Sequence, residues 1–498
     1  MSLDKLPEEW RQASILTSIT HTGLISDGDW VESKDQDPNG SVRLIQLADI
    51  GDGYFKNKSE RFMTPEKVRS LNCTYLIPGD VLVARMPEPL GRACIFPDIG
   101  KNAVTVVDIC LLRTSTCSAI NNNILVHWLN SPAIRSIIEQ NSSGSTRKRI
   151  TRKKLEQFII PLPPLAEQKI IAEKLDTLLA QVDSTKARLE QIPQILKRFR
   201  QAVLASAVSG KFTAEWRTSN NSKIIGEEIE NTKNKLIEKK VVKKDLIYTA
   251  LERTYTIPPS WLYIKLQSIA TKITDGEHKT PKREIMGQLL LSARNIQDGY
   301  IKLSDVDYVG DAEFQKLRNR CDPDIGDVLI SCSGSIGRVC LVDENSKYVM
   351  VRSVALVKLM QDFVINKYMM YLLQSPLLQK EIEENSKSTA QANLFLGPIK
   401  NLGIPLPSLP EQTEIVRCVE QLFAYADTIE KQVNNALAHV NSLTQSILAK
   451  AFRGELTAQW RAENPDLISG ENSAAALLEK IKAERAASGS KKVSRKKK

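Results

Sequence analysis

Two long stretches of the sequence carry apolar residues at alternating spacings of three and four positions, the pattern of a coiled-coil helix. Neither 165–209 nor 409–453 contains a glycine, and each ends at a glycine, Gly210 or Gly454. Amphipathic helices on separate domains would also carry such stripes, but equal length and phase favour mutual packing. We predict an antiparallel coiled coil with its seam at Ile171, Leu175, Leu178, Val182, Leu189, Ile192, Leu196, Phe199, Ile415, Val419, Leu422, Ile429, Val433, Val440, Leu443 and Ile447.

The two stretches belong to an internal repeat that covers most of the chain. PLPPLAEQ (161–168) matches PLPSLPEQ (405–412), and GKFTAEWR (210–217) matches GELTAQWR (454–461), in both cases 244 residues apart. Weaker pairs keep the same order upstream, for example DGY at 52–54 and at 298–300. The chain is therefore two copies of one plan, which predicts an internal pseudo-twofold repeat.

Upstream of each helix lies a segment in which short apolar runs alternate with Gly, Pro, Asn and Asp. SVRLIQL (41–47), DVLVA (80–84), DVLIS (327–331) and KYVMVRSVALVKL (347–359) predict strands, and one helix is expected near 122–139 and one near 364–384. The predicted fold class is α/β (α+β), two copies separated by the helices. The predicted boundaries are mixed domains at 1–160 and 257–404, helical spacers at 161–217 and 405–463, a polar linker at 218–256, and a short helix with a basic tail at 464–498.

Charge and composition exclude several classes of protein. Lys and Arg outnumber Asp and Glu by 69 to 58, and six of the positive charges lie in the last eight residues. The remaining basicity permits a nucleic-acid partner without requiring one. The opening MSLDKLPEEW lacks the apolar segment of a secretory signal, and no apolar run is long enough for a membrane span. Eight scattered cysteines and four histidines predict no metal site, so we expect a cytoplasmic protein with reduced thiols.

The sequence contains no recognisable catalytic constellation. It has no phosphate-binding loop, dinucleotide fingerprint, nucleophile elbow or H-E-x-x-H motif, and it lacks the Asn/Asp-Pro-Pro-aromatic tetrapeptide of amino-methyltransferases. We therefore expect no catalytic residues, although scattered Asp and Glu pairs leave a divergent nuclease open.

Polar and basic residues at expected loop positions are the candidates for DNA contact. Arg can read guanine, Asn and Gln can read adenine, and Ser, Thr and Lys can hold phosphates. The candidates are Arg43, Gln46, Arg85, Arg92, Ser145, Thr146, Arg147, Lys148 and Arg149 in the first copy, and Arg294, Asn295, Ser333, Ser335, Arg338, Arg352, Gln391 and Asn393 in the second.

The doubled PLPPLAEQ and PLPSLPEQ motifs, each opening a long helix that ends at GKFTAEWR or GELTAQWR, resemble the specificity subunit of type I restriction-modification enzymes, most of all its type IA group. This resemblance implies that the mixed domains are target-recognition domains, each reading one half of a split site in double-stranded DNA. It also implies two methyltransferase subunits that methylate adenine N6, and two restriction subunits that join through them. S-adenosylmethionine, ATP and Mg²⁺ would be used on those other subunits, and no cofactor would be bound by this chain.

Three alternatives remain open at this point. The chain could be a stand-alone DNA-binding protein, a coiled-coil adaptor without a methylase partner, or an enzyme with diverged motifs. Adjacent genes for a methylase and a translocase would oppose the first two, and methyl transfer by the purified chain alone would establish the third.

We predict that the helices set the gap between the two halves of the DNA site. Inserting about four residues at matching places in both helices should lengthen the gap by one or two base pairs, because the rise is ~1.5 Å per residue and ~3.4 Å per base pair. Mapping of methylated adenines would measure the gap. A methylated motif with its old spacing would contradict the prediction.

Overall fold

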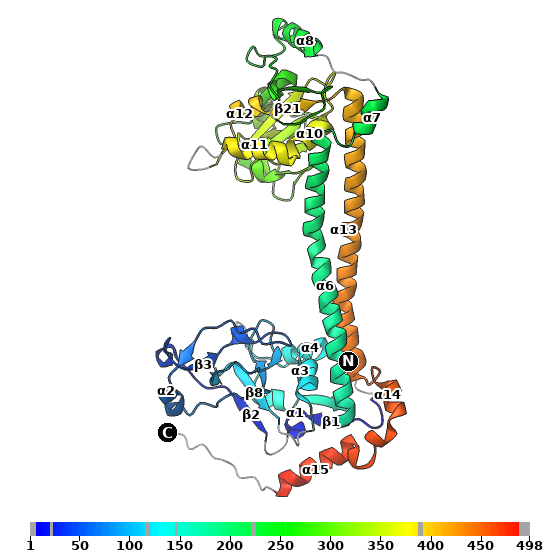
Figure 1. Cartoon of the computed structure of the whole chain (residues 1–498). Helices are drawn as coiled ribbons and strands as arrows, with labels where there is room; N and C mark the ends of the chain where they lie inside the picture. Colours follow the sequence, from blue (N-terminus) through cyan, green and yellow to red (C-terminus); the bar gives the residue numbers. More distant parts are fainter. Residues whose placement is uncertain are drawn as a thin grey trace. The chain divides into compact units, whose positions relative to one another are not determined.

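The protein is described by a computed structural model that covers residues 6–19, 23–114, 119–144, 148–220, 226–253, 255–386 and 392–487 (Figure 1). It divides into two compact units. The first consists of Met1–Glu190 and Asn435–Lys498, and the second of Gln191–Asn434. Each unit therefore contains one end of each long helix.

The two long helices are α6 (Leu165–Val208) and α13 (Leu409–Phe452). In each unit the beginning of one helix packs beside the end of the other, so the helices run antiparallel, which confirms the coiled-coil prediction. In the first unit, Ile171, Ala172 and Leu175 share a core with Leu448, Ala451 and Phe452; in the second, Val203, Leu204, Ala207 and Val208 share one with Ile415, Val416 and Val419.

One predicted seam position is wrong. Leu443 is 48% exposed, whereas Val440, Leu448 and Ala451 on the same helix are buried. A straight helix has 3.6 residues per turn rather than 3.5, so a strict heptad stripe drifts around its surface along the helix. The other predicted seam residues are buried or half-buried.

The mixed domain of the first unit contains two sheets and a separate strand pair. An antiparallel sheet has the order β2 (Leu24–Asp27), β8 (Ile109–Arg113), β5 (Val81–Ala84), β6 (Ala93–Ile95). The second sheet has the order β4 (Phe62–Met63), β3 (Val42–Ile45), β7 (Ala103–Thr105), and β1 (Arg11–Ser14) pairs with β9 (Ile159–Leu162). The accompanying helices are α1 (Ile15–Ser18), α2 (Pro65–Ser70), α3 (Asn122–Asn130), α4 (Pro132–Gln140) and α5 (Arg152–Glu156).

The mixed domain of the second unit repeats this arrangement. Its antiparallel sheet has the order β11 (Ala270–Asp275), β20 (Val354–Leu359), β17 (Val328–Ser331), β18 (Val339–Leu341). A mixed sheet has the order β12 (Arg283–Glu284), β16 (Asp307–Val309), β13 (Gln288–Leu291), β19 (Tyr348–Met350). β10 (Leu262–Lys265) pairs with β21 (Gly403–Leu406), and β14 (Ile296–Gln297) with β15 (Tyr300–Ile301). The helices are α9 (Asp311–Arg320), α10 (Asn366–Gln374), α11 (Pro376–Ser386) and α12 (Leu396–Asn401).

Two sequence predictions need correction here. The run 347–359 is not one strand, because it divides into β19 and β20, which lie in different sheets. The single helices expected near 122–139 and 364–384 are helix pairs that break at Ser131 and Ser375, both extended. Each serine precedes a proline, and a residue before proline avoids the helical conformation.

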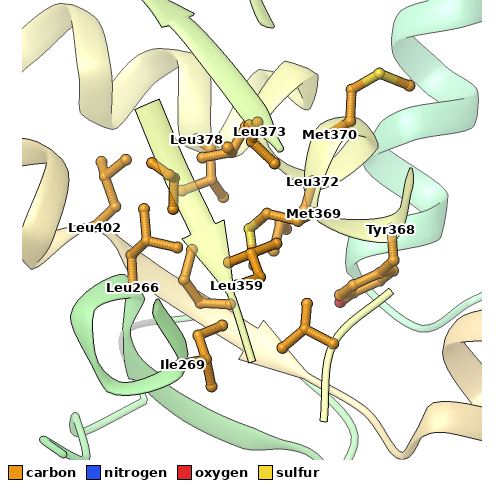
Figure 2. Close-up of a cluster of buried hydrophobic side chains, with 14 of the residues drawn as sticks. Leu266, Ile269, Leu359, Tyr368, Met369, Met370, Leu372, Leu373, Leu378 and Leu402 are labelled. Atoms are coloured by element: carbon orange, nitrogen blue, oxygen red, sulfur yellow. The ribbon is translucent and has the colours of Figure 1, made fainter. Parts of the chain in front are cut away.

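The core of the second unit joins its mixed domain to the helices. Leu266 and Ile269 meet Leu359 of β20, Tyr368, Met369, Leu372 and Leu373 of α10, Leu378 of α11 and Leu402 (Figure 2). The same buried cluster continues to Ile415 and Val419 of α13. The antiparallel sheet of this unit is therefore fixed to the beginning of a long helix by continuous apolar packing.

The segment predicted as a polar linker is part of the second unit's core. It contains α8 (Gly226–Glu238), and Ile229, Val242 and Leu246 are buried. Lys233 is fully buried, and its Nζ donates to the carbonyl of Gln267 at 2.8 Å and to that of Ala270. Burial lowers the pKa of Lys233 to about 8. The prediction of a polar linker failed because the lysines of this segment dominate its composition, whereas its three apolar residues are the ones that pack into the core.

Short helices follow both long ones, α7 (Ala214–Ser219) after α6, and α14 (Ala458–Glu463) and α15 (Ala474–Ala487) after α13. Leu478 and Ile481 of α15 are buried in the core of the first unit. The basic tail at 488–498 lies outside the described residues.

A buried carboxylate joins three distant parts of the chain in the first unit. Glu167, in the first turn of α6, is fully buried. It accepts hydrogen bonds from Trp10 Nε1 at 2.8 Å, Thr457 Oγ1 at 2.6 Å and Arg461 Nη1 at 2.5 Å. We call these four residues the first clasp. The clasp ties the start of α6 to the segment after α13 and to the start of the mixed domain.

The second unit contains the same arrangement, which we call the second clasp. Glu411, in the first turn of α13, is fully buried and accepts from Trp261 Nε1 at 2.9 Å, Thr213 Oγ1 at 2.6 Å and Arg217 Nη1 at 2.5 Å. Arg217 also donates to the carbonyl of Gly210 at 2.7 Å. The repeated Thr-x-x-x-Arg of the GKFTAEWR and GELTAQWR motifs therefore binds the glutamate of the other helix.

We predict that each clasp is a main source of stability in its unit. Glu167→Gln should lower the free energy of unfolding by about 3 kcal/mol, because it removes the ion-pair partner 2.5 Å from Arg461 in a buried site and leaves only Glu9, at 3.7 Å. Glu411→Gln should have a similar effect through Arg217. Thermal and urea unfolding of the full chain would measure both losses.

The matched control is Glu479→Gln, which removes an exposed ion pair with Lys482. Exposed pairs contribute about 0–1 kcal/mol, so this variant should unfold almost like the wild type. Equal small losses in all three variants would show that the clasps do not stabilise the units.

Candidate nucleic-acid interface

The strand register identifies one equivalent position in the two mixed domains. Asp27 at the end of β2 pairs with Cys110, and Asp275 at the end of β11 pairs with Ala355. The sequence around them is S-D-G-D-W (26–30) in one domain and T-D-G-E-H (274–278) in the other. A side chain on either glycine would collide with the backbone of the neighbouring strand, which explains the glycine at Gly28 and Gly276.

Further pairings extend this equivalence. Ile150 N donates to the carbonyl of Arg85, and Leu394 N donates to that of Cys332. Arg149 of the first domain therefore corresponds to Asn393 of the second, and Val107 corresponds to Arg352 by the register of β8 and β20. The same edge of the same sheet thus carries different side chains in the two domains.

In the first domain this edge, the Asp27 site, is occupied by ion pairs. Arg85 Nη1 lies 2.8 Å from Asp27, and Arg149 Nη2 lies 3.3 Å from Asp108. Arg85 is buried, and burial lowers its pKa while the nearby Asp27 carboxylate acts in the opposite direction. Trp30 follows Asp27 closely in the sequence and is 69% exposed. The site therefore offers a half-exposed guanidinium on Arg149 and an exposed indole.

In the second domain the equivalent edge is a hollow of about 580 Å³, lined by Asp275, His278, Ser333, Arg352, Asn393 and Phe395 among others. Asp275 lies 2.7 Å from His278 Nε2 and 3.2 Å from Arg320 Nη2. Arg352 is exposed, and its guanidinium has no hydrogen-bond or ion-pair partner within the described part of the chain. The hollow therefore combines a free cation, hydroxyl and amide groups and a neutralised carboxylate.

The structure brings some of the predicted DNA-contact residues to these two sites. Arg85, Lys148 and Arg149 lie at or next to the Asp27 site, with Lys148 exposed and paired to Glu139 at 2.8 Å. Ser333, Arg352 and Asn393 line the hollow. Four further candidates, Ser145, Thr146, Arg147 and Gln391, lie outside the described residues.

Arg92 lies elsewhere and is fully engaged in the fold. It is buried, and its guanidinium donates to the carbonyls of Ile50 at 2.8 Å, Leu47 at 2.7 Å, Pro89 at 3.0 Å and Met86 at 3.3 Å. Burial lowers the pKa of Arg92, with Asp52 acting in the opposite direction. These contacts support a structural role, so the proposed interface does not include Arg92.

The remaining candidates also make intramolecular contacts away from the two sites. Arg43 is buried beside Asn57 and over the ring of Phe62, and Asn295 is buried in four hydrogen bonds. Arg294 pairs with Asp307 at 2.9 Å, and Arg338 donates to Gln297 at 2.9 Å. Gln46 caps a short turn, and the carbonyl of Ser335 accepts from Ser331.

Sequence reasoning missed Trp30, Asp275 and His278. The signal was available in the repeat, because S-D-G-D-W and T-D-G-E-H are identical or chemically similar at their first four positions and differ in kind at the last, Trp30 and His278. When two copies of one motif share the same backbone, a position at which their side chains differ is a candidate site residue.

Comparison with known proteins now decides the family. The model of the type I restriction modification DNA specificity domain matches the chain twice, at residues 25–194 and 258–439. The chain belongs to the family of type I restriction-modification specificity subunits. It is 40% identical to the type I restriction enzyme EcoKI specificity subunit of Escherichia coli (strain K12), over 100% of both chains. It is 49% identical to the EcoBI specificity subunit of Escherichia coli, over 76% of this chain and 74% of that one.

Solved structures support the fold of this specificity subunit. A chain from the study "Structural basis underlying complex assembly and conformational transition of the type I R-M system" aligns with a TM-score of 0.63 at 18% identity, covering 91% of this chain and 99% of that one. The crystal structure of the HsdS subunit from Thermoanaerobacter tengcongensis aligns with a TM-score of 0.53 at 18% identity, covering 90% and 98%. The mixed domains are therefore target-recognition domains on paired helices.

Across residues that the structure describes, no group of three His, Cys, Asp or Glu side chains is arranged to hold a metal ion. Nor does any described helix combine the length and apolarity needed to cross a membrane. The described free cysteines are buried or half-buried, and burial raises the pKa of the Cys94, Cys110 and Cys332 thiols to about 12.

We predict that Arg92 and Arg149 differ in their effect on folding. Arg92→Met should lower the free energy of unfolding by about 2–4 kcal/mol, because several buried carbonyls lose their donor. Arg149→Met should cost less than about 1 kcal/mol, because its side chain is 36% exposed. Thermal unfolding of the two variants would measure this. A large loss in both would assign Arg149 to the fold and remove it from the proposed interface.

Proposed function

We propose that this specificity subunit recognises a split site in double-stranded DNA, with each recognition domain reading one half. One observation carries the proposal most directly. The two domains share a sheet order and a clasp, but at the equivalent sheet edge one carries Arg85, Arg149 and Trp30 and the other Cys332, Asn393 and His278. Equal scaffolds with unlike surfaces suit the recognition of two unlike sequences.

Within the proposed complex, the subunit binds two methyltransferase subunits, which methylate adenine N6 in each half-site. Two restriction subunits join through the methyltransferases. S-adenosylmethionine, ATP and Mg²⁺ are held by these partners, and this chain contributes recognition without catalysis. The full-length similarity to the EcoKI specificity subunit supports this role. So do the clasps, which fix each recognition domain to a long helix with a buried ion pair.

The experiment is to express the chain with its methyltransferase subunits in a host that lacks adenine methylation, and to map the methylated adenines. We expect two short motifs separated by a fixed unspecified gap. Replacing the N-terminal recognition domain with that of a relative should change one motif only. The exchange should extend through Leu162, because β1 and β9 pair up to that residue.

Two controls accompany the mapping. The purified chain alone should transfer no methyl group, and the methyltransferase subunits without it should give no split motif. Exchange of one domain that altered both motifs would contradict independent reading. Methyl transfer by the chain alone would establish an enzyme instead of a recognition subunit.

A further inference from the structure

The hollow of the C-terminal recognition domain holds a cation, Arg352, that forms no ion pair with any residue the structure describes. Arg352 follows β19 and precedes β20, and its backbone N–H is bound to the carbonyl of Glu277 at 3.0 Å. The backbone is therefore fixed, while the guanidinium is exposed and without a partner among the described residues. A guanidinium has five donors and no acceptor, so a ligand for it must present acceptors.

The equivalent position in the N-terminal domain is Val107, and the arginines around it are already paired. Arg85 and Arg149 are held by Asp27 and Asp108, and both also donate to the carbonyl of Val107. In the C-terminal domain the carboxylate that corresponds to Asp27 is Asp275, and it is bound by His278 and Arg320 instead. Because these neighbours pair with one another, Arg352 has no ion-pair partner in the described part of the chain.

The lining of the hollow favours a nucleobase over a phosphate. Asp275 lines the same space as Arg352, so the lining offers acceptors as well as donors; this matches a base pair, which presents both, better than a phosphate, which presents acceptors alone. Ser333 and Asn393, joined by a backbone bridge, add neutral groups to the lining that can donate and accept. The exposed ring of Phe395 gives the rim an apolar surface.

We propose that Arg352 is the specificity residue that reads a guanine in the half-site of the C-terminal domain. This inference rests on the proposed function. The two guanidinium donors meet the O6 and N7 acceptors of one guanine in the major groove as a rigid planar fork, a fixed geometry that the flexible ammonium of Lys lacks. Because Val107 stands at this position in the other domain, that domain has no equivalent contact.

The test uses the full chain with its methyltransferase subunits and compares Arg352→Ala with Arg352→Lys. Methylated-adenine mapping and binding to single-base variants of the site are both measured. In both variants, discrimination at one guanine should fall about tenfold or more, while the N-terminal half-site stays unchanged. Val107→Ala is the matched control and should leave both half-sites unchanged. Arg352 is exposed and its guanidinium has no partner among the residues described, so thermal unfolding should match the wild type for both arginine variants.

Several results would overturn the inference. If Arg352→Ala weakened binding uniformly across sequences, and Arg352→Lys restored it, the residue would be a phosphate contact. Unchanged discrimination in both variants, or a C-terminal half-site with no guanine on either strand, would remove Arg352 from base reading. A wild-type complex that produced no split motif would instead refute the proposed function, and with it this inference.

Discussion

A buried glutamate in the first turn of each long helix is the interaction on which the rest of the structure depends. Glu167 and Glu411 are both fully buried, and each is satisfied by an indole, a hydroxyl and a guanidinium from other parts of the chain. A buried carboxylate is costly unless it is fully bonded, so the three donors must all be in place. This requirement places the beginning of each long helix beside the end of the other.

The clasps separate the part of the molecule that must be constant from the part that can vary. Trp10 and Trp261 enter the clasps from the start of each recognition domain, so the base of each domain is fixed. At the sheet edge near Asp27 and Asp275, by contrast, the side chains differ between the two domains while the strand register stays the same. A rigid base with a replaceable edge lets one architecture recognise many DNA sequences.

Sequence patterns predicted the helices and the repeat well, because a heptad stripe and a doubled motif are local and periodic. Leu443 was misassigned because the stripe drifts, and the linker because Ile229, Val242 and Leu246 are isolated among lysines. The sequence could not separate Arg92, whose guanidinium binds four carbonyls, from Arg352, whose guanidinium binds none among the described residues. Arg92 follows a glycine and Arg352 lies within the run 347–359 that was predicted as a strand, and neither setting reveals whether acceptors lie nearby, which only the folded backbone shows.

The first clasp has a consequence for the order in which the protein matures during synthesis. Thr457 and Glu167 are 290 positions apart, and Leu478 and Ile481 complete the core around Trp10. The N-terminal domain therefore leaves the ribosome long before its last core residues exist. The second unit, whose clasp and core lie within 191–434, has all its residues earlier. Domains usually fold in order from the N-terminus during synthesis. Here the unit whose synthesis begins first is the last to have all of its core residues.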